Sequence, residues 1–244
     1  MRRTVLVTGG SRGIGAACVS AFARAGWSVV FLYRRAEEAA ESLCARLRGE
    51  GLDVSCRRCD VSRRDEVFRT VDDLMRTYHR FDALVNNAGV AHIGLFTDMT
   101  EEQWDALFAV NLKGAFNVTQ AVLPGMISQG SGAIVNVSSM WGEVGASCEV
   151  AYSAAKAALI GMTKALAKEV GPSGVRVNCV SPGVIDTDMN AELTEADLAA
   201  LAEETPLGRI GRAEEVANAT LYLCGEGASF ITGQTLGVSG GLVV

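Results

Sequence analysis

The chain has 244 residues, of which 49% are hydrophobic and 20% are charged; this composition is typical of a globular protein with a large core and excludes a disordered chain. The formal net charge of −6 argues against binding to nucleic acid or to an anionic membrane surface, because phosphate groups would repel the protein. No stretch reaches the ~20 apolar residues of a membrane span, and the first apolar run is too short for a signal peptide, so a cytoplasmic protein is expected.

Short valine-rich runs recur along the chain and predict the strands of a parallel sheet. Their continuous hydrophobicity is typical of strands that are covered on both faces. The predicted strands are 5–7, 29–33, a run within 53–61, 82–86, 133–137, 175–180 and 235–238.

Stretches with helical periodicity separate these runs. Apolar residues recur at three- and four-residue spacing over 62–78, and T-E-E-Q at 100–103 is a capping box that opens a helix toward Leu123. E-A-D-L-A-A-L-A-E-E at 195–204 predicts a further short helix. The alternation predicts an α/β fold, in which one doubly wound parallel sheet of about seven strands carries helices on both faces, as a single domain over 1–244.

A glycine-rich turn, T-G-G-S-R-G-I-G at 8–15, lies between the first predicted strand and the first predicted helix. Gly9, Gly13 and Gly15 allow backbone N–H groups to approach a diphosphate, while the helix directs its positive end toward that diphosphate. A purely structural tight turn is the alternative, and the position between strand and helix favours phosphate binding.

Seven cysteines, at positions 18, 44, 56, 59, 148, 179 and 224, are read as free thiols. The pair in C-R-R-C at 56–59 falls in a predicted strand, where residues three apart face opposite sides of the sheet. No metal site is expected, and these thiols are interpreted as small buried hydrophobic groups.

The stretch A-Y-S-A-A-K at 151–156 places Tyr152 and Lys156 four residues apart, on one face of a predicted helix. A free tyrosine titrates near ~10, and an adjacent ammonium group is expected to lower that pKa. Taken alone, such a pair is usually ordinary helix surface. The sequence context favours a proton donor and the charge that tunes it.

These motifs together resemble the short-chain dehydrogenase/reductase family over nearly the whole chain. The resemblance lies in T-G-x-x-x-G-x-G, in N-N-A-G at 86–89, in Asn111, and in the spacing of Ser139, Tyr152 and Lys156. It implies a Rossmann-like sheet and a reduction in which a nicotinamide gives hydride and Tyr152 gives the proton.

The resemblance also implies roles for individual residues. Ser139 would hold the carbonyl oxygen, Lys156 would bind the nicotinamide ribose, and Asn111 would hold a water that connects Lys156 to solvent. The implied catalytic residues are Asn111, Ser139, Tyr152 and Lys156. The implied cofactor contacts are Gly9, Ser11, Arg12, Gly13, Ile14, Gly15, Tyr33, Arg34, Arg35, Asp60, Val61, Asn87, Ala88, Gly89, Tyr152, Lys156, Pro182, Gly183, Ile185 and Thr187.

NADP(H) is the predicted cofactor. NAD-using relatives carry an acidic residue at the end of the second strand, where this chain has Tyr33 followed by Arg34 and Arg35. With Arg12, these guanidinium groups would attract a ribose 2′-phosphate. The alternative is that they are solvated surface arginines.

Substrate class is predicted from a second level of resemblance. T-P-L-G-R-I-G-R-A-E-E-V-A, from Thr205, is similar to bacterial 3-oxoacyl-acyl-carrier-protein reductases of fatty acid biosynthesis, and 184–211 would be the substrate lid. Yet no Lys or Arg occurs from Gly114 to Ala155, where an acidic carrier protein would dock. The expected substrate-lining residues are Met140, Trp141, Glu149 and Met189.

M-W-G followed by G-A-S-C-E-V is similar to elongation factor P 5-aminopentanone reductases, and Glu149 would then pair with the ammonium group of the substrate. NADPH-dependent reduction of a ketone to a secondary alcohol covers both substrates, tethered to acyl carrier protein or to elongation factor P. The alternative from a different class is a nonenzymatic NADP-binding sensor. By resemblance, helices over 104–123 and 152–166 pair across a two-fold axis, and the C-terminal G-G-L-V-V completes a homotetramer.

Overall fold

The computed structural model describes residues 2–190 and 194–243 and is built around one seven-stranded parallel sheet. Its strand order is β3-β2-β1-β4-β5-β6-β9, so the order reverses between β1 and β4. The strands are β1 (Thr4–Thr8), β2 (Ser28–Tyr33), β3 (Val54–Arg58), β4 (Ala83–Asn86), β5 (Gly132–Val137), β6 (Val175–Pro182) and β9 (Thr235–Val238). Ligands of doubly wound sheets bind at the carboxyl ends of the strands beside such a reversal.

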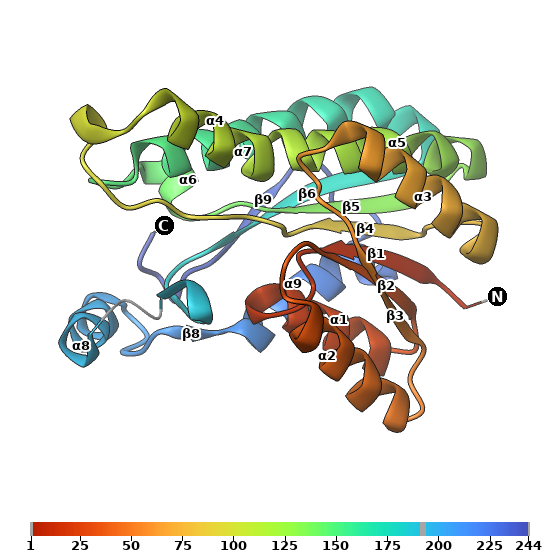
Figure 1. The fold of residues 1–244 in the computed structure, drawn as a ribbon, viewed down its shortest axis with the longest axis horizontal. Helices are drawn as coiled ribbons and strands as arrows, with labels where there is room; N and C mark the ends of the chain where they lie inside the picture. Colours follow the sequence, from red (N-terminus) through yellow and green to blue (C-terminus); the bar gives the residue numbers. More distant parts are fainter. Residues whose placement is uncertain (1, 191–193, 244) are drawn as a thin grey trace.

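Helices cover both faces of this sheet, as Figure 1 shows. One face carries α1 (Gly13–Arg24), α2 (Glu37–Gly49) and α9 (Ala213–Cys224). The other carries α3 (Arg64–Tyr78), α4 (Glu101–Asn111), α5 (Lys113–Gln129) and α7 (Val150–Val170). The short helices α6 (Trp141–Val144) and α8 (Glu195–Glu204) lie beyond one end of the sheet, where β7 (Ile185–Asp186) also pairs with β8 (Gly211–Arg212).

Two apolar cores explain why the strands are hydrophobic without alternation. Val5 and Val7 face the core under α1, α2 and α9, whereas Leu6 between them faces the core under α3, α5 and α7. Val29 and Val30 divide in the same way. Because both faces are buried, apolar residues follow one another in the middle of β1 and β2 without alternation.

A chain of buried hydrogen bonds links the centre of the sheet to α7. Asn86 of β4 donates from Nδ2 to Asn136 Oδ1 of β5 at 2.9 Å, and Asn136 Nδ2 donates to Thr163 Oγ1 of α7 at 2.8 Å. Thr163 Oγ1 in turn donates to the Leu159 carbonyl at 2.8 Å. Asn136 and Thr163 have no exposed surface, so a rotation of α7 would leave buried polar groups unpaired.

The predicted doubly wound sheet of about seven strands is confirmed, and so are the capping box at Thr100 and the helix over 195–204. The prediction of one continuous helix from the capping box toward Leu123 was wrong. Helix α4 ends at Asn111, and α5 begins at Lys113 after Leu112, whose φ is −113° and ψ is −57°. The break lets α4 pack against α7 while α5 packs against α3.

All seven cysteines are free, as expected. Five of them are buried, and Cys56 and Cys148 are partly exposed. Within 2–190 and 194–243, no helix combines the length and the apolar character that a bilayer crossing requires.

Candidate active site

The glycine turn joins β1 to α1 in a shape that only glycines allow. Gly9 and Gly13 have φ of 66° and 53°, in the left-handed region. A Cβ on Gly15 would collide with the Gly9 carbonyl oxygen, and a Cβ on Gly9 would lie 2.9 Å from Ala88 Cα. The turn therefore leaves its backbone open to a ligand at the N-terminus of α1.

Thr8 braces this turn against the end of β4, a role that the sequence analysis did not assign. Its Oγ1 accepts hydrogen bonds from the backbone N–H groups of Asn87 and Ala88, both at 3.0 Å. Asn87 Nδ2 donates back to the carbonyls of Thr8 and Gly9 at 3.1 Å each. A threonine that ends a buried strand immediately before a glycine was the available signal.

Tyr152 and Lys156 lie on the buried face of α7, at 8% and 4% exposure. Lys156 Nζ donates to the Val137 carbonyl at 2.8 Å and lies 5.5 Å from the centre of the Tyr152 ring. The Ser138 hydroxyl donates to the Lys156 carbonyl at 2.8 Å and ties α7 to the loop after β5. The expectation that the two side chains share one helix face is confirmed.

The side chain of Asn111, at the end of α4, lies close to Lys156. Its Oδ1 accepts from the Val90 N–H and its Nδ2 donates to the Val90 carbonyl, both at 2.8 Å. A Cβ built on Gly89 would lie 3.5 Å from both Asn111 Oδ1 and Lys156 Nζ. Gly89, Asn111 and Lys156 are therefore neighbours.

Ser139 follows β5 and lies beside Tyr152. The Ser139 hydroxyl accepts from the Trp141 N–H at 3.2 Å. Burial raises the pKa of Tyr152 to about 12, against a hydrogen bond with Ser139 that lowers it, and the charge of Glu149 raises it further. The expectation of a lowered Tyr152 pKa was wrong for the protein alone, because removal of the phenolate from water outweighs its neighbours.

Burial acts on Lys156 in the opposite sense. It lowers the pKa of Lys156 to about 8, and the nearby Cys179 thiol partly offsets this change. Burial disfavours the charged ammonium form. Lys156 therefore loses its proton closer to neutral pH than an exposed lysine does.

Two of the three predicted phosphate-binding arginines lie near carboxylates, Arg34 after β2 and Arg12 in the glycine turn. Arg34 Nη1 lies 3.6 Å from Asp60 Oδ2, and Arg12 Nη1 lies 4.0 Å from Asp188 Oδ2. Arg35 is exposed. Tyr33 is only 7% exposed, and its hydroxyl donates to Glu37 Oε1 at 3.3 Å, a contact that the sequence analysis missed.

The other predicted cofactor residues lie in the glycine turn, at the end of β6 or in the segments that follow β3 and β6. Thr187 lies beside Gly13, since a Cβ on Gly13 would be 3.4 Å from Thr187 Cγ2. Asp60 Oδ1 caps the following turn by accepting from Ser62, and the buried Val61 accepts from Asn117. Ser11 and Ile14 are partly exposed in the glycine turn, Pro182 accepts from the Met140 N–H, Gly183 donates to Val238, and Ile185 is buried.

The predicted substrate-lining residues differ in exposure. Met189 is 52% exposed and Glu149 is half-buried, whereas Met140 is only 2% exposed and lies beneath the surface. Trp141 packs against the cluster that contains Leu107 and Tyr152. Of the predicted lid over 184–211, residues 191–193 lie outside the described residues; the remainder forms β7, α8 and β8.

A family model described as "Enoyl-(Acyl carrier protein) reductase" matches residues 9–243. Since this match spans nearly the whole chain, the chain belongs to the short-chain dehydrogenase/reductase family and is an oxidoreductase that acts on CH–OH or C=O groups. Enzymes of this class use a nicotinamide cofactor.

Individual relatives match end to end. The chain is 43% identical over 242 residues to 3-oxoacyl-[acyl-carrier-protein] reductase FabG of Thermotoga maritima, covering 99% of this chain and 98% of that protein. It is 41% identical to the uncharacterized oxidoreductase YmfI of Bacillus subtilis, covering 99% of both. A crystal structure of an actinorhodin polyketide ketoreductase variant with NADPH superimposes with a TM-score of 0.95 at 35% identity, covering 99% of this chain and 97% of that one.

The residues at the carboxyl ends of the strands fit a dinucleotide. The glycines leave the backbone at 9–15 uncovered, and a Cβ on Gly15 would clash with that backbone. Arg12, Arg34 and Arg35 add positive charge at one side. Within 2–190 and 194–243, no three His, Cys, Asp or Glu side chains are grouped to hold a metal ion.

Proposed function

We propose that the protein reduces a ketone to a secondary alcohol with NADPH. The observation that carries this proposal is the meeting of Ser139, Tyr152, Lys156 and Asn111 at the end of the sheet where the glycine turn opens. The bound nicotinamide would supply the hydride to the carbonyl carbon. The protein's own side chains have to place the ketone and supply one proton to its oxygen.

Tyr152 is the proposed proton donor. With a pKa of about 12, the phenol is fully protonated at neutral pH and ready to donate from Oη to the carbonyl oxygen as negative charge develops there. Ser139 Oγ is the proposed second hydrogen-bond donor to that oxygen. Ser139 lies close enough to Tyr152 to lower its pKa, which supports their acting on one atom.

Lys156 and Asn111 are the proposed route by which Tyr152 regains its proton. The Lys156 ammonium would stabilise the phenolate left after the transfer, and its pKa of about 8 lets it exchange a proton near neutral pH. Both polar atoms of the Asn111 side chain are hydrogen-bonded, so this side chain is held in one position beside Lys156. Lys156 would also bind the nicotinamide ribose.

The choice of NADPH over NADH rests on the charge beside Tyr33. Arg12, Arg34 and Arg35 lie where the adenosine ribose is expected, and a 2′-phosphate would compete for the guanidinium groups now near Asp60 and Asp188. The relative crystallised with NADPH supports the same choice. Comparing Kd values for NADP+ and NAD+ by calorimetry tests it, and equal affinities would refute it.

The first candidate substrate is a 3-oxoacyl group on acyl carrier protein, in line with the Thermotoga relative. Purified protein mixed with NADPH and acetoacetyl carrier protein should consume NADPH, followed at the nicotinamide absorbance band. A generic β-keto ester serves as the carrier-free control. Tight NADPH binding without turnover of any ketone would favour a nonenzymatic sensor instead.

The second candidate is a ketone that carries an ammonium group, such as an aminopentanone on elongation factor P. Glu149 favours this candidate. The carboxylate is half-buried at the start of α7, and burial raises its pKa. Its charge also raises the pKa of Tyr152. No hydrogen bond or ion pair to its side chain is present within 2–190 and 194–243. A cationic substrate would supply the missing partner.

An aminoketone and a neutral ketone of equal length separate the two candidates. Glu149→Gln should lower kcat/KM for the aminoketone about tenfold and leave the neutral ketone within about twofold. Glu143→Gln, at an exposed position on α6, is the matched control. Equal turnover of the aminoketone by Glu149→Gln and the unaltered protein would remove the second candidate.

A homotetramer is the proposed assembly, in a single domain whose lid spans about 184–211. Phe116 on α5 is 43% exposed, and Phe230, just before β9, is fully exposed. Apolar surface on these two sides supports two separate subunit contacts. Light scattering at the monomer mass would contradict the proposal.

A further inference from the structure

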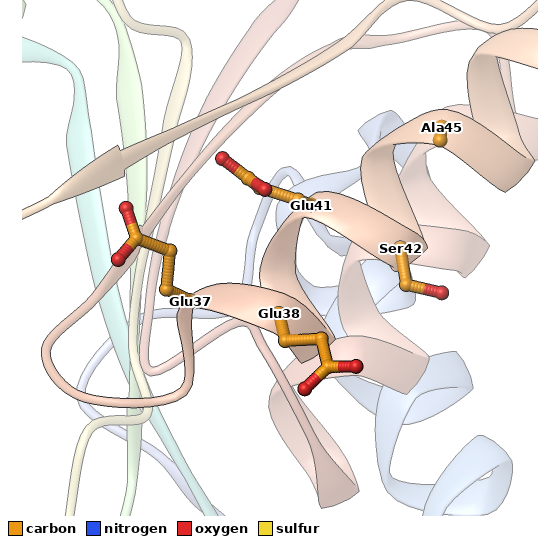
Figure 2. A pocket seen from close by; sticks show the side chains of 5 residues that line it. All are labelled: Glu37, Glu38, Glu41, Ser42 and Ala45. Carbon is orange, nitrogen blue, oxygen red and sulfur yellow. The ribbon is translucent and has the colours of Figure 1, made fainter.

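The carboxyl end of β2 holds a buried phenol against an acidic helix start. The Tyr33 hydroxyl donates to Glu37 Oε1 at 3.3 Å, and the Glu37 N–H donates to the Arg35 carbonyl at 3.0 Å. Glu37 is therefore fixed at its backbone and at its carboxylate. Glu37, Glu38 and Glu41 together line an open hollow of about 660 Å³ on α2 (Figure 2).

The three carboxylates of this hollow do not point the same way. In Figure 2, the side chains of Glu37 and Glu41 rise toward one side of α2, and Glu38 points to the other. The pKa of Tyr33 is raised, first by burial and then by its neighbours, among them the charges of Glu37 and Glu41. Glu37 and Glu41 therefore place negative charge beside Tyr33.

This negative charge lies next to the residues that would receive a 2′-phosphate. Arg34 and Arg35 follow Tyr33 directly, and Arg34 is already 3.6 Å from Asp60. A second phosphate on the adenosine ribose would meet attraction from the arginines and repulsion from the carboxylate that Tyr33 holds in place.

We propose that Glu37 is a specificity-determining residue that opposes the 2′-phosphate and limits the preference for NADP(H) over NAD(H). The inference rests on the proposed use of a nicotinamide dinucleotide at this site. Tyr33 acts as a positioning residue, since its hydroxyl donates a hydrogen bond to the exposed Glu37 carboxylate and orients it.

Calorimetric titration with NADP+ and NAD+ tests the proposal without any turnover, because these two ligands differ only in the 2′-phosphate. Glu37→Gln keeps the size and hydrogen-bonding capacity of the side chain and removes its charge. NADP+ should bind about fivefold more tightly to Glu37→Gln at low salt, with NAD+ unchanged within about twofold, as expected for a partly screened charge. The gain should shrink in 0.5 M salt.

Glu38→Gln is the matched control, since it makes the same charge change one residue along the same helix, where the side chain points away from that of Glu37. Equal tightening by Glu38→Gln would show that only net charge matters and would overturn the proposal. A Glu37→Gln variant with unchanged NADP+ affinity, or with weakened NAD+ binding, would also overturn it. Failure of either dinucleotide to bind the unaltered protein would instead refute the proposed function, and this inference with it.

Discussion

The glycine turn at 8–15 owes its shape to residues without a side chain, whereas the group around Tyr152 depends on side chains that are buried by packing. In the turn, Gly9, Gly13 and Gly15 lie within one segment of seven residues and leave backbone exposed. Around Tyr152, polar side chains from α4, the loop after β5 and α7 converge, and each bonds to the backbone of another segment: Asn111 to Val90, Ser138 to Lys156, and Lys156 to Val137. The turn is specified locally, and the Tyr152 group depends on the packing of the whole sheet.

Of the changes considered, removal of the Tyr152 hydroxyl should have the largest effect on activity. Tyr152→Phe is expected to lower kcat/KM for a ketone about 10³-fold, because it removes the proposed proton donor. NADPH affinity, measured by fluorescence titration, should stay within about threefold. Tyr222→Phe, at a half-exposed tyrosine on α9, serves as the control, and turnover by Tyr152→Phe at the control's rate would contradict the assignment.

A buried lysine should make stability depend on pH. The folded pKa of Lys156 is about 8 and the ordinary value is 10.5, so between these two values the unfolded chain binds more protons than the folded protein. The free energy of unfolding, taken relative to Lys156→Met, should therefore rise from pH 8 to 10.5, by up to about 3 kcal/mol. Below pH 8 the difference should be flat.

Urea denaturation of the unaltered protein and Lys156→Met across that range measures the effect. Taking the difference between the two removes the titration of the cysteines that both proteins share. A difference that falls as pH rises would mean that the folded protein holds the Lys156 proton more tightly than the unfolded chain.

The glycine turn should respond to added bulk. Gly15→Ala places a Cβ against the Gly9 carbonyl oxygen, so the turn has to open. The expected cost is about 2 kcal/mol of stability, with at least about tenfold weaker NADPH binding. Gly49→Ala, at the end of α2 with no atom near its Cβ, is the control and should leave both quantities unchanged.

The smallest expected effect concerns an exposed charge pair. Arg12 and Asp188 approach to 4.0 Å with both side chains exposed, so Asp188→Asn should leave the free energy of unfolding unchanged within measurement. The same change frees Arg12 and should tighten NADP+ binding about twofold at low salt. Weaker binding by Asp188→Asn would instead give Asp188 a direct part in holding the dinucleotide.

Much of the fold could be predicted because its signals are local. Strand β1 carries consecutive apolar residues, Val5, Leu6 and Val7, since both of its faces are buried. The relation of Tyr152 to Lys156 follows from helix geometry alone, and the capping box at Thr100 is written in four consecutive residues.

Other features depend on tertiary packing, and the sequence pattern did not contain them. The break at Leu112 arises because α4 and α5 pack on different helices. The raised pKa of Tyr152 reflects burial, which a helical spacing does not reveal. The contact between Tyr33 and Glu37 depends on how α2 leaves β2, and Met140 is buried although its position beside Ser139 suggested a cleft wall.

The bond from Asn136 to Thr163 has a consequence for how the protein can diversify. Thr163 lies about three turns beyond Tyr152, on the same stripe of α7, so the amide beneath the helix fixes the direction in which the phenol points. The segments over 140–149 and 184–211 make no part of that anchor. Insertions or exchanges in these two segments would therefore leave the anchor of α7, and with it the position of Tyr152, in place.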